Sequence, residues 1–193
     1  MNAPQLWLAR HAPPLIAPGH CYGRLDIPAD AAATQEAAQA LAHALPQRVL
    51  VWHSPLQRCV QLAHALQTLR PDTISQPDVR LQEMDFGAWE GRRWDDIPRD
   101  EIDAWVADFA HYRPGGGENL QTMLLRVASA WQAAQSLATE QQSPVLWLSH
   151  AGVARCVQWL QQAPATQPPS ATQWPQQAPA LGAWRCWPLD VVA

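Results

Sequence analysis

The sequence of 193 residues contains no lysine, and all 13 of its basic residues are arginine. This absence excludes lysine Schiff-base chemistry and a Walker-type phosphate loop, because both need a lysine side chain. The net charge of −4 at pH 7 leaves no basic footprint for nucleic acid, so we expect no nucleic-acid partner.

Long apolar runs and paired cysteines are also missing. No run of about 18 apolar residues occurs, and the opening MNAPQLWLAR lacks the pattern of a signal peptide. The cysteines have neither C-x-x-C spacing nor the spacing of a zinc site; they are Cys21, Cys59, Cys156 and Cys186. We therefore expect a cytoplasmic protein with reduced thiols and with no membrane partner or bound metal.

Short apolar segments alternate with segments of helical period along the chain. The segments 5–10, 48–54 and 144–150 have the composition of buried parallel strands, and 181–189 is typical of a terminal edge strand. The predicted helices span 34–45, 55–69, 100–109, 118–138 and 151–162. This alternation predicts an α/β fold, a three-layer α/β/α sandwich with a mostly parallel central sheet. We expect one domain over 1–193, with 163–180 as an irregular connection rich in Pro, Gln and Ala.

Two of the predicted helices carry start signals. Thr34 is a candidate N-cap for the helix 34–45. Before the helix 55–69, Ser54 is a candidate N-cap, Pro55 suits the first helical position and Gln57 completes a capping box.

Cationic side chains follow three of the predicted strands. Arg10 and His11 end the first strand, Arg58 lies in the first helical turn after the second, and His150 ends the third. Because the carboxyl ends of parallel strands share one edge of a sheet, these side chains are expected to converge beside two helix N-termini. Alone, each would be an ordinary surface histidine or a solvated arginine, but together they indicate a phosphate site.

A carboxyl group in aromatic surroundings completes the predicted site. The segment LQEMDFGAWEGRRWDDI contains Glu83, Asp85 and Glu90. Apolar neighbours and a bound phosphate dianion favour the protonated form of a carboxyl, which suits a general acid. We assign that role to Glu83 and interpret Asp85 and Glu90 as carboxylates that cap turns.

At these residues the sequence resembles the histidine phosphatase superfamily. The similar segments are LARHA, HSPLQRCVQLAHAL, LQEMDFGAWEG and LSHAGVARCV, in family order over about residues 6–160. The resemblance implies a histidine acid-type phosphatase without cofactor or metal. His11 would accept the phosphoryl group, Arg10, Arg58 and His150 would bind its oxygens, and Glu83 would transfer protons.

Two departures from the family pattern concern the pocket rim. Alanine replaces the glycine that follows each histidine, at Ala12 and Ala151, and Ala17 stands where the family often has an asparagine that binds phosphate. Each alanine still offers a backbone N–H. We interpret these changes as a different rim and not as a loss of the reaction.

Within the superfamily the sequence is most similar to the α-ribazole-5′-phosphate phosphatases of cobalamin assembly. The similar segments are APGHCYGRLDIPAD and DFGAWEGRRWDDIPRDEIDAW, followed by YRPGGGEN. This implies that Tyr22 and Gly23 line the substrate side and that Glu118 approaches it. Turn geometry alone would also explain Gly23 and the glycines 115–117.

The expected function is therefore hydrolysis of a small-molecule phosphate monoester, α-ribazole 5′-phosphate, through a phosphohistidine in cobalamin biosynthesis. Alternatives within the same chemistry are a phosphoglycerate mutase-like phosphoryl transferase and a broad-specificity sugar phosphatase. An alternative of another class is a non-catalytic phosphate-binding regulatory module. The leaving group and a homodimeric state are left open by the sequence.

Overall fold

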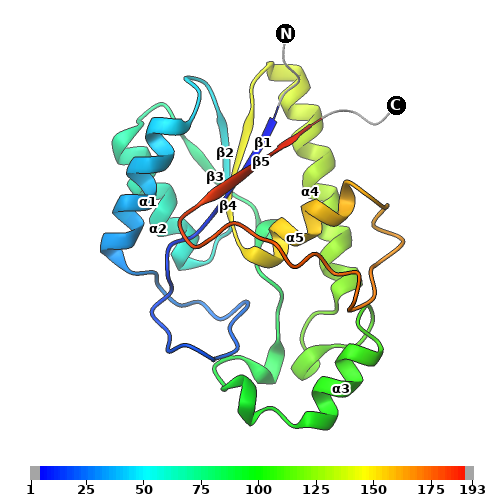
Figure 1. Ribbon diagram of the computed structural model, residues 1–193. Helices are drawn as coiled ribbons and strands as arrows, with labels where there is room; N and C mark the ends of the chain where they lie inside the picture. Colours follow the sequence, from blue (N-terminus) through cyan, green and yellow to red (C-terminus); the bar gives the residue numbers. More distant parts are fainter. Residues whose placement is uncertain (1–4, 190–193) are drawn as a thin grey trace.

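The computed structural model describes residues 5–189 and contains one five-stranded sheet of order β3-β2-β4-β1-β5 (Figure 1). The strands are β1 (Gln5–Arg10), β2 (Leu50–His53), β3 (Ser75–Pro77), β4 (Val145–Ser149) and β5 (Trp184–Pro188). The first four are parallel to one another, and β5 pairs antiparallel with β1 at the edge. The sheet is thus mostly parallel, as predicted.

Helices cover both faces of this sheet. The α-helices are α1 (Ala31–Ala44), α2 (Gln57–Leu69), α3 (Arg99–Ala107), α4 (Leu120–Gln141) and α5 (Ala151–Leu160). Short 3-10 helices are η1 (Val79–Leu81), η2 (Gly87–Trp89), η3 (Trp94–Asp96) and η4 (Pro114–Gly116). Helices α1 and α2 lie on one face, and α4 and α5 lie on the other (Figure 1). This confirms the predicted three-layer α/β/α sandwich.

Two hydrophobic cores follow from the alternation of side chains along the strands. Leu8 of β1 and Trp147 of β4 are buried against α4 and α5, whereas Ala9 and Leu148 are buried against α1 and α2. All five residues of the central strand β4 are buried. A strand covered on both faces needs such a continuous apolar sequence.

The first predicted helix cap is wrong by one turn. Helix α1 begins at Ala31, and the side chain of Asp30 accepts a hydrogen bond of 2.8 Å from the backbone N–H of Ala33. Thr34 lies inside the helix, where its hydroxyl donates to the carbonyl of Asp30. An aspartate one turn earlier therefore supplies the cap that we assigned to threonine.

The capping box predicted for α2 is also wrong. The helix begins at Gln57 after Leu56, without a side-chain cap. The amide of Gln57 and its side chain bond instead to Asp26. The Oγ of Ser54 is 3.4 Å from the amide of Leu56 but only 2.8 Å from Nε2 of His150. The side chain of Ser54 therefore bonds to His150, which is distant in sequence, and does not cap the helix as its local sequence predicts.

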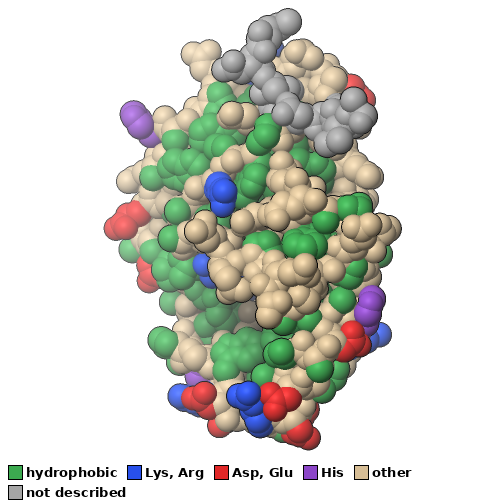
Figure 2. Space-filling view, turned by 45° about the vertical axis from the view of Figure 1, so that its right-hand side comes forward, with side chains coloured by type: hydrophobic (Ala, Val, Ile, Leu, Met, Phe, Trp, Pro, Cys, Tyr) green, Lys and Arg blue, Asp and Glu red, His purple; other side chains and the backbone are tan. Residues whose placement is uncertain are grey.

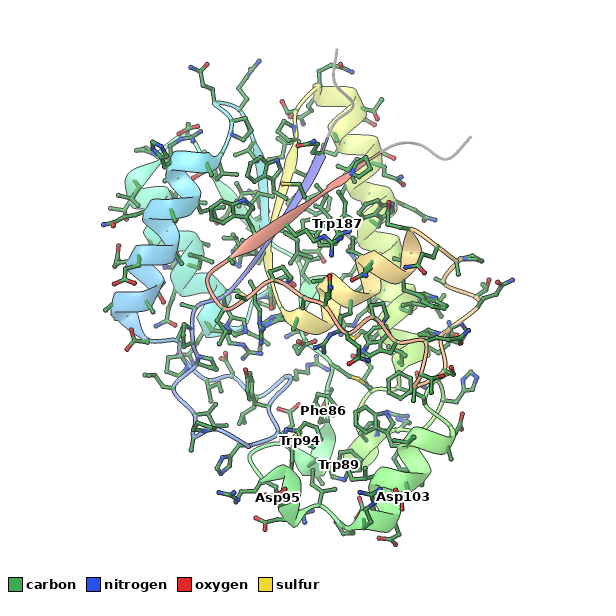
Figure 3. The ribbon with its side chains drawn as sticks, in the orientation of Figure 1. Phe86, Trp89, Trp94, Asp95, Asp103 and Trp187 are labelled. Carbon is green, nitrogen blue, oxygen red and sulfur yellow. The ribbon has the colours of Figure 1, made fainter. Side chains whose placement is uncertain are left out.

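Below the sheet in Figure 1, residues 83–118 and α3 form an aromatic cluster. Phe86, Trp89 and Trp94 lie together in it, with edge-to-face ring contacts (Figure 3). Figure 2 shows charged side chains gathered at this lower end, below a broad hydrophobic area. Between residues 5 and 189, no helix has both the length and the apolar character needed to cross a membrane.

Candidate active site

The two predicted site histidines lie side by side at the carboxyl edge of the sheet. Strands β1 and β4 are paired so that Arg10 is opposite Ser149. The residue that follows each strand is a histidine, and the ring centroids of His11 and His150 are 5.1 Å apart. The parallel register of two neighbouring strands therefore produces the predicted convergence.

The imidazole of His11 is buried and held by a hydrogen bond at each ring nitrogen. Nδ1 is 2.7 Å from the carbonyl oxygen of Ala12, and Nε of Arg58 donates to Nε2 over 3.3 Å. A carbonyl only accepts and a guanidinium only donates, so the proton lies on Nδ1 and the lone pair on Nε2. Burial, then the charge of Arg58, lowers the pKa of His11 to about 3. His11 is thus a neutral imidazole whose nucleophilic lone pair on Nε2 accepts a hydrogen bond from Arg58.

Arg58 is fully buried and connects His11 to the loop 20–26. Its guanidinium donates to the carbonyls of Gly23 and Leu25 as well as to His11. The guanidinium carbon also lies 5.7 Å from the centre of the Tyr22 ring. Arg58 therefore orders the loop that brings Tyr22 to the cavity, and it places a permanent charge beside the nucleophile.

Arg10 lines the cavity and retains hydrogen-bonding capacity. Its Nη1 donates to the carbonyl of Pro179 over 3.2 Å, whereas its buried Nε has no partner within residues 5–189. A buried N–H without an acceptor is costly, so an anion at this position would be favoured.

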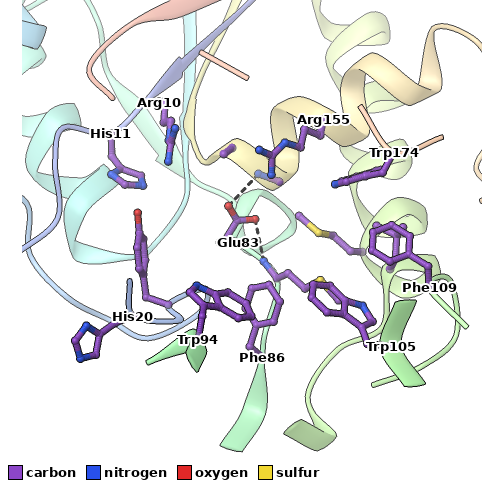
Figure 4. Close-up of a pocket in the computed structure, with 16 residues that line it drawn as sticks. Arg10, His11, His20, Glu83, Phe86, Trp94, Trp105, Phe109, Arg155 and Trp174 are labelled. Atoms are coloured by element: carbon purple, nitrogen blue, oxygen red, sulfur yellow. Dashed lines mark hydrogen bonds between the residues drawn. The ribbon is translucent and has the colours of Figure 1, made fainter. Parts of the chain in front are cut away.

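Glu83 lies at the N-terminus of α5 (Figure 4). Its carboxylate accepts from the backbone N–H of Gly152 over 2.9 Å and from that of Met84 over 3.1 Å. Close approach requires glycine here, since a Cβ on residue 152 would lie 2.1 Å from Oε1 of Glu83. The helix start therefore fixes the position of this carboxyl group.

A cavity of about 410 Å³ lies beside these groups (Figure 4). Arg58 and His150 are fully buried behind its wall and do not line it. Arg10, His11, Tyr22 and Glu83 are on its polar side. Aromatic side chains form much of the remaining wall, namely Phe86, Trp94, Trp105, Phe109 and Trp174. Between residues 5 and 189, no group of three His, Cys, Asp or Glu side chains could hold a metal ion.

Arg155 and Trp174 are among the residues of this wall that sequence reasoning missed. Arg155 lines the cavity from α5, five residues after His150. Its place one to two turns after a strand-end histidine was a signal that we did not use. Trp174 comes from the irregular segment 163–180 and packs edge-to-face against Phe109. No periodicity in that segment could have placed it.

The remaining predicted residues have structural contacts. A Cβ at Gly23 would lie 1.9 Å from the carbonyl oxygen of Met84, so close backbone packing requires the glycine. Glu118 forms an ion pair of 2.7 Å with Arg126 and is not part of the cavity wall. The structure therefore does not bring Glu118 to the substrate side.

Asp85 and Glu90 cap turns, in agreement with our interpretation. Asp85 accepts from the N–H of Gly87 over 2.8 Å. Glu90 accepts from the N–H groups of Phe86 and Arg24 over 2.9 and 2.8 Å, which joins the loop 20–26 to the segment 83–90.

Comparisons with known proteins show the family and the fold of this chain. The model of the histidine phosphatase superfamily (branch 1) matches residues 6–179. A candidate alpha-ribazole-5'-P phosphatase from Escherichia coli is 29% identical, with a TM-score of 0.76, covering 96% of this chain and 90% of that one. A mycobacterial glucosyl-3-phosphoglycerate phosphatase is 24% identical, with a TM-score of 0.67, covering 85% of this chain and 82% of that one. At this identity it shows the fold alone.

One curated relative matches part of the chain. It is a 6-phosphofructo-2-kinase/fructose-2,6-bisphosphatase from Caenorhabditis elegans, 33% identical over 111 residues. The match covers 55% of this chain and only 22% of the length of that protein.

Proposed function

Because this chain belongs to branch 1 of the histidine phosphatase superfamily, we propose that it hydrolyses small-molecule phosphate monoesters through a phosphohistidine on His11. The observation that carries the proposal is the state of this imidazole. Its Nδ1–H donates to the carbonyl oxygen of Ala12, and the lone pair on Nε2 accepts from the guanidinium of Arg58. A neutral imidazole beside fixed cations is suited to attack a phosphate.

In the first step, Nε2 of His11 attacks phosphorus in line with the leaving oxygen. The N–P bond forms as the P–O bond breaks, and the leaving oxygen takes a proton from Glu83. Arg58 exchanges its contact with Nε2 for a phosphoryl oxygen, while Arg10 and His150 bind the others. Guanidiniums suit this role because they donate charge-assisted hydrogen bonds in a fixed plane.

In the second step, water attacks the phosphohistidine from the side that the leaving alcohol vacates. Glu83, now ionised, accepts a proton from this water. The P–N bond breaks, and its electron pair returns to Nε2. Inorganic phosphate leaves, and His11 is again neutral.

The cavity wall supports a leaving group with a planar ring system. Six Phe, Trp and Tyr side chains line it, and such rings bind flat heteroaromatic groups by stacked or edge-to-face contacts. α-Ribazole 5′-phosphate carries a benzimidazole on its ribose and fits this description. The similarity to the candidate alpha-ribazole-5'-P phosphatase of Escherichia coli also supports this substrate. We therefore retain it as the proposed substrate, within cobalamin biosynthesis.

A sugar phosphate with a second anionic group is the other candidate. Arg155 supports it, because this cavity residue has a buried Nε without a partner in the described chain. The partial similarity to the 6-phosphofructo-2-kinase/fructose-2,6-bisphosphatase of Caenorhabditis elegans also supports this second candidate.

A substrate panel separates the two candidates. We expect kcat/KM for α-ribazole 5′-phosphate to exceed that for ribose 5-phosphate by about tenfold or more, since stacking contributes about 1–3 kcal/mol per base. Trp174→Leu should remove much of this preference. The matched control Trp7→Leu should not, because Trp7 stacks on Trp184 of the sheet. Higher kcat/KM for fructose 2,6-bisphosphate would favour the second candidate and contradict the first.

A further inference from the structure

Ser54 and His150 meet at the ends of two adjacent strands. Ser54 follows β2 and His150 follows β4, and these strands pair so that His53 is opposite Leu148. Both side chains are fully buried, and Oγ of Ser54 is 2.8 Å from Nε2 of His150. The contact therefore follows from the register of the sheet, in the same way as the contact between the two histidines.

The hydrogen bonds of Ser54 determine which atom carries the proton. A hydroxyl has one proton to donate and two lone pairs. The amide of Leu56 donates to this oxygen over 3.4 Å, Nε2 of His150 lies 2.8 Å from it, and the thiol of Cys59 is a further hydrogen-bond neighbour. If Nε2 carried a proton, the buried hydroxyl proton would face only the sulfur of Cys59, which is a weak acceptor, and this is costly. With Ser54 as donor and Nε2 as acceptor, the hydroxyl proton, the Nε2 lone pair and the Leu56 amide all have partners.

The thiol of Cys59 lies beside the same nitrogen. Its Sγ is 3.6 Å from Nε2 of His150 and 3.6 Å from the carbonyl oxygen of Ser149. Burial raises the pKa of the Cys59 thiol to about 12, so the sulfur keeps its proton. The single thiol proton is donated to the carbonyl of Ser149, so Ser54 is the side chain that donates to Nε2.

The other ring nitrogen of His150, Nδ1, is buried and has no hydrogen-bond partner among the described residues. Burial, followed by the charge of Arg58, lowers the pKa of His150 well below its ordinary value, so the ring carries a single proton. With Nε2 as acceptor, that proton is on Nδ1. An unpaired N–H then lies in a ring adjacent to the ring of His11.

We propose that Ser54 is a positioning residue that fixes the tautomer of His150, so that the Nδ1–H group is the donor offered to the phosphoryl oxygen. The proposal rests on the proposed function, since it assigns a donor for that reaction. In this proposal Ser54 acts on the reaction by orienting the proton of His150, and it does not contact the substrate. The wrong tautomer would present a lone pair to an anion, so loss of Ser54 should slow formation of the phosphohistidine.

The tautomer can be read directly by NMR in the phosphate-free enzyme. Two-bond ¹H–¹⁵N correlations of protein labelled at histidine distinguish Nδ1–H from Nε2–H, and His150→Gln identifies the signals. We expect Nδ1–H in the wild type, in Ser54→Thr and in the matched control Cys59→Ala. We expect an added Nε2–H population in Ser54→Ala. An Nε2–H ring in the wild type, or an unchanged ring in Ser54→Ala, would overturn the proposal.

Kinetics on the same variants test the consequence. The burst rate with p-nitrophenyl phosphate should fall about tenfold or more in Ser54→Ala and recover in Ser54→Thr. A changed tautomer with an unchanged burst rate would overturn the positioning role. Thermal unfolding of each variant shows whether it is folded. Failure of the proposed function is distinguishable, because it would appear as a wild type without a phosphoenzyme while the NMR reading is unaffected.

Discussion

At the scale of single residues, Glu83 has the most demanding task, because it must give a proton in one step and take one in the next. Its two backbone hydrogen bonds fix its position, and it shares a cavity with His11. The nearby carboxylates Asp85 and Glu90 are not part of the wall of this cavity. This leaves Glu83 as the acid of the proposed reaction.

The first prediction is that Glu83→Gln damages catalysis according to the leaving group. Glutamine keeps the shape but has no proton to transfer. Cleavage of a ribose 5′-phosphate should fall about 10²–10⁴-fold, whereas the burst with p-nitrophenyl phosphate should slow far less. A burst followed by a slow steady state is expected, measured by stopped flow. Equal slowing of the burst with both substrates would show that Glu83 is structural.

At the scale of elements, the start of α5 both supplies His150 and holds Glu83. His150 is the residue before the helix, and Gly152 in its first turn donates to Glu83. The element therefore couples two groups of the site that are far apart in sequence. A side chain at position 152 would separate them, because its Cβ would overlap the carboxyl group.

The second prediction follows from this packing. Gly152→Ala should reduce activity on poor leaving groups about as strongly as Glu83→Gln, because the methyl group displaces the acid. Helix stability should not fall, since alanine is favoured over glycine in helices by about 1 kcal/mol. Thermal unfolding and kcat on both substrate types check this. Full activity with an unchanged melting temperature would contradict the proposed place of Glu83.

The elements also show what the sequence could predict. The strand patterns located β1, β2, β4 and β5, and the end-of-strand rule placed His11 beside His150, because both features depend on local composition and general topology. β3 was missed because a strand of three residues, Ser75–Pro77, leaves no periodicity. Ser54 was assigned to a cap, since sequence does not show its tertiary partner.

At the scale of the whole molecule, the buried histidines couple stability to pH. The pKa of His11 is about 3 in the folded protein and that of His150 is also lowered, whereas histidine in an unfolded chain titrates near 6.5. As the pH falls from about 6.5 toward 3, the unfolded chain binds protons that the folded protein does not. The free energy of unfolding therefore decreases through this window and is fully retained above it.

The third prediction is that His11→Asn weakens this dependence. Between about pH 7.5 and about pH 4.5, the wild type should lose about 2 kcal/mol more of its free energy of unfolding than the variant, because one buried imidazole has been removed. Urea unfolding at both pH values measures the difference. Equal losses in the two proteins would contradict the buried, neutral state of His11.

The central claim is the covalent phosphoryl group on His11, and denaturing rapid quench tests it most directly. With ³²P-labelled substrate, we expect an acid-labile, base-stable label on the peptide that contains His11. The matched control His20→Asn, which replaces another histidine of the cavity wall, should still form it. His11→Asn should form no label and should keep less than about one hundredth of the wild-type kcat. Turnover without a labelled enzyme, or a label on another residue, would contradict the account.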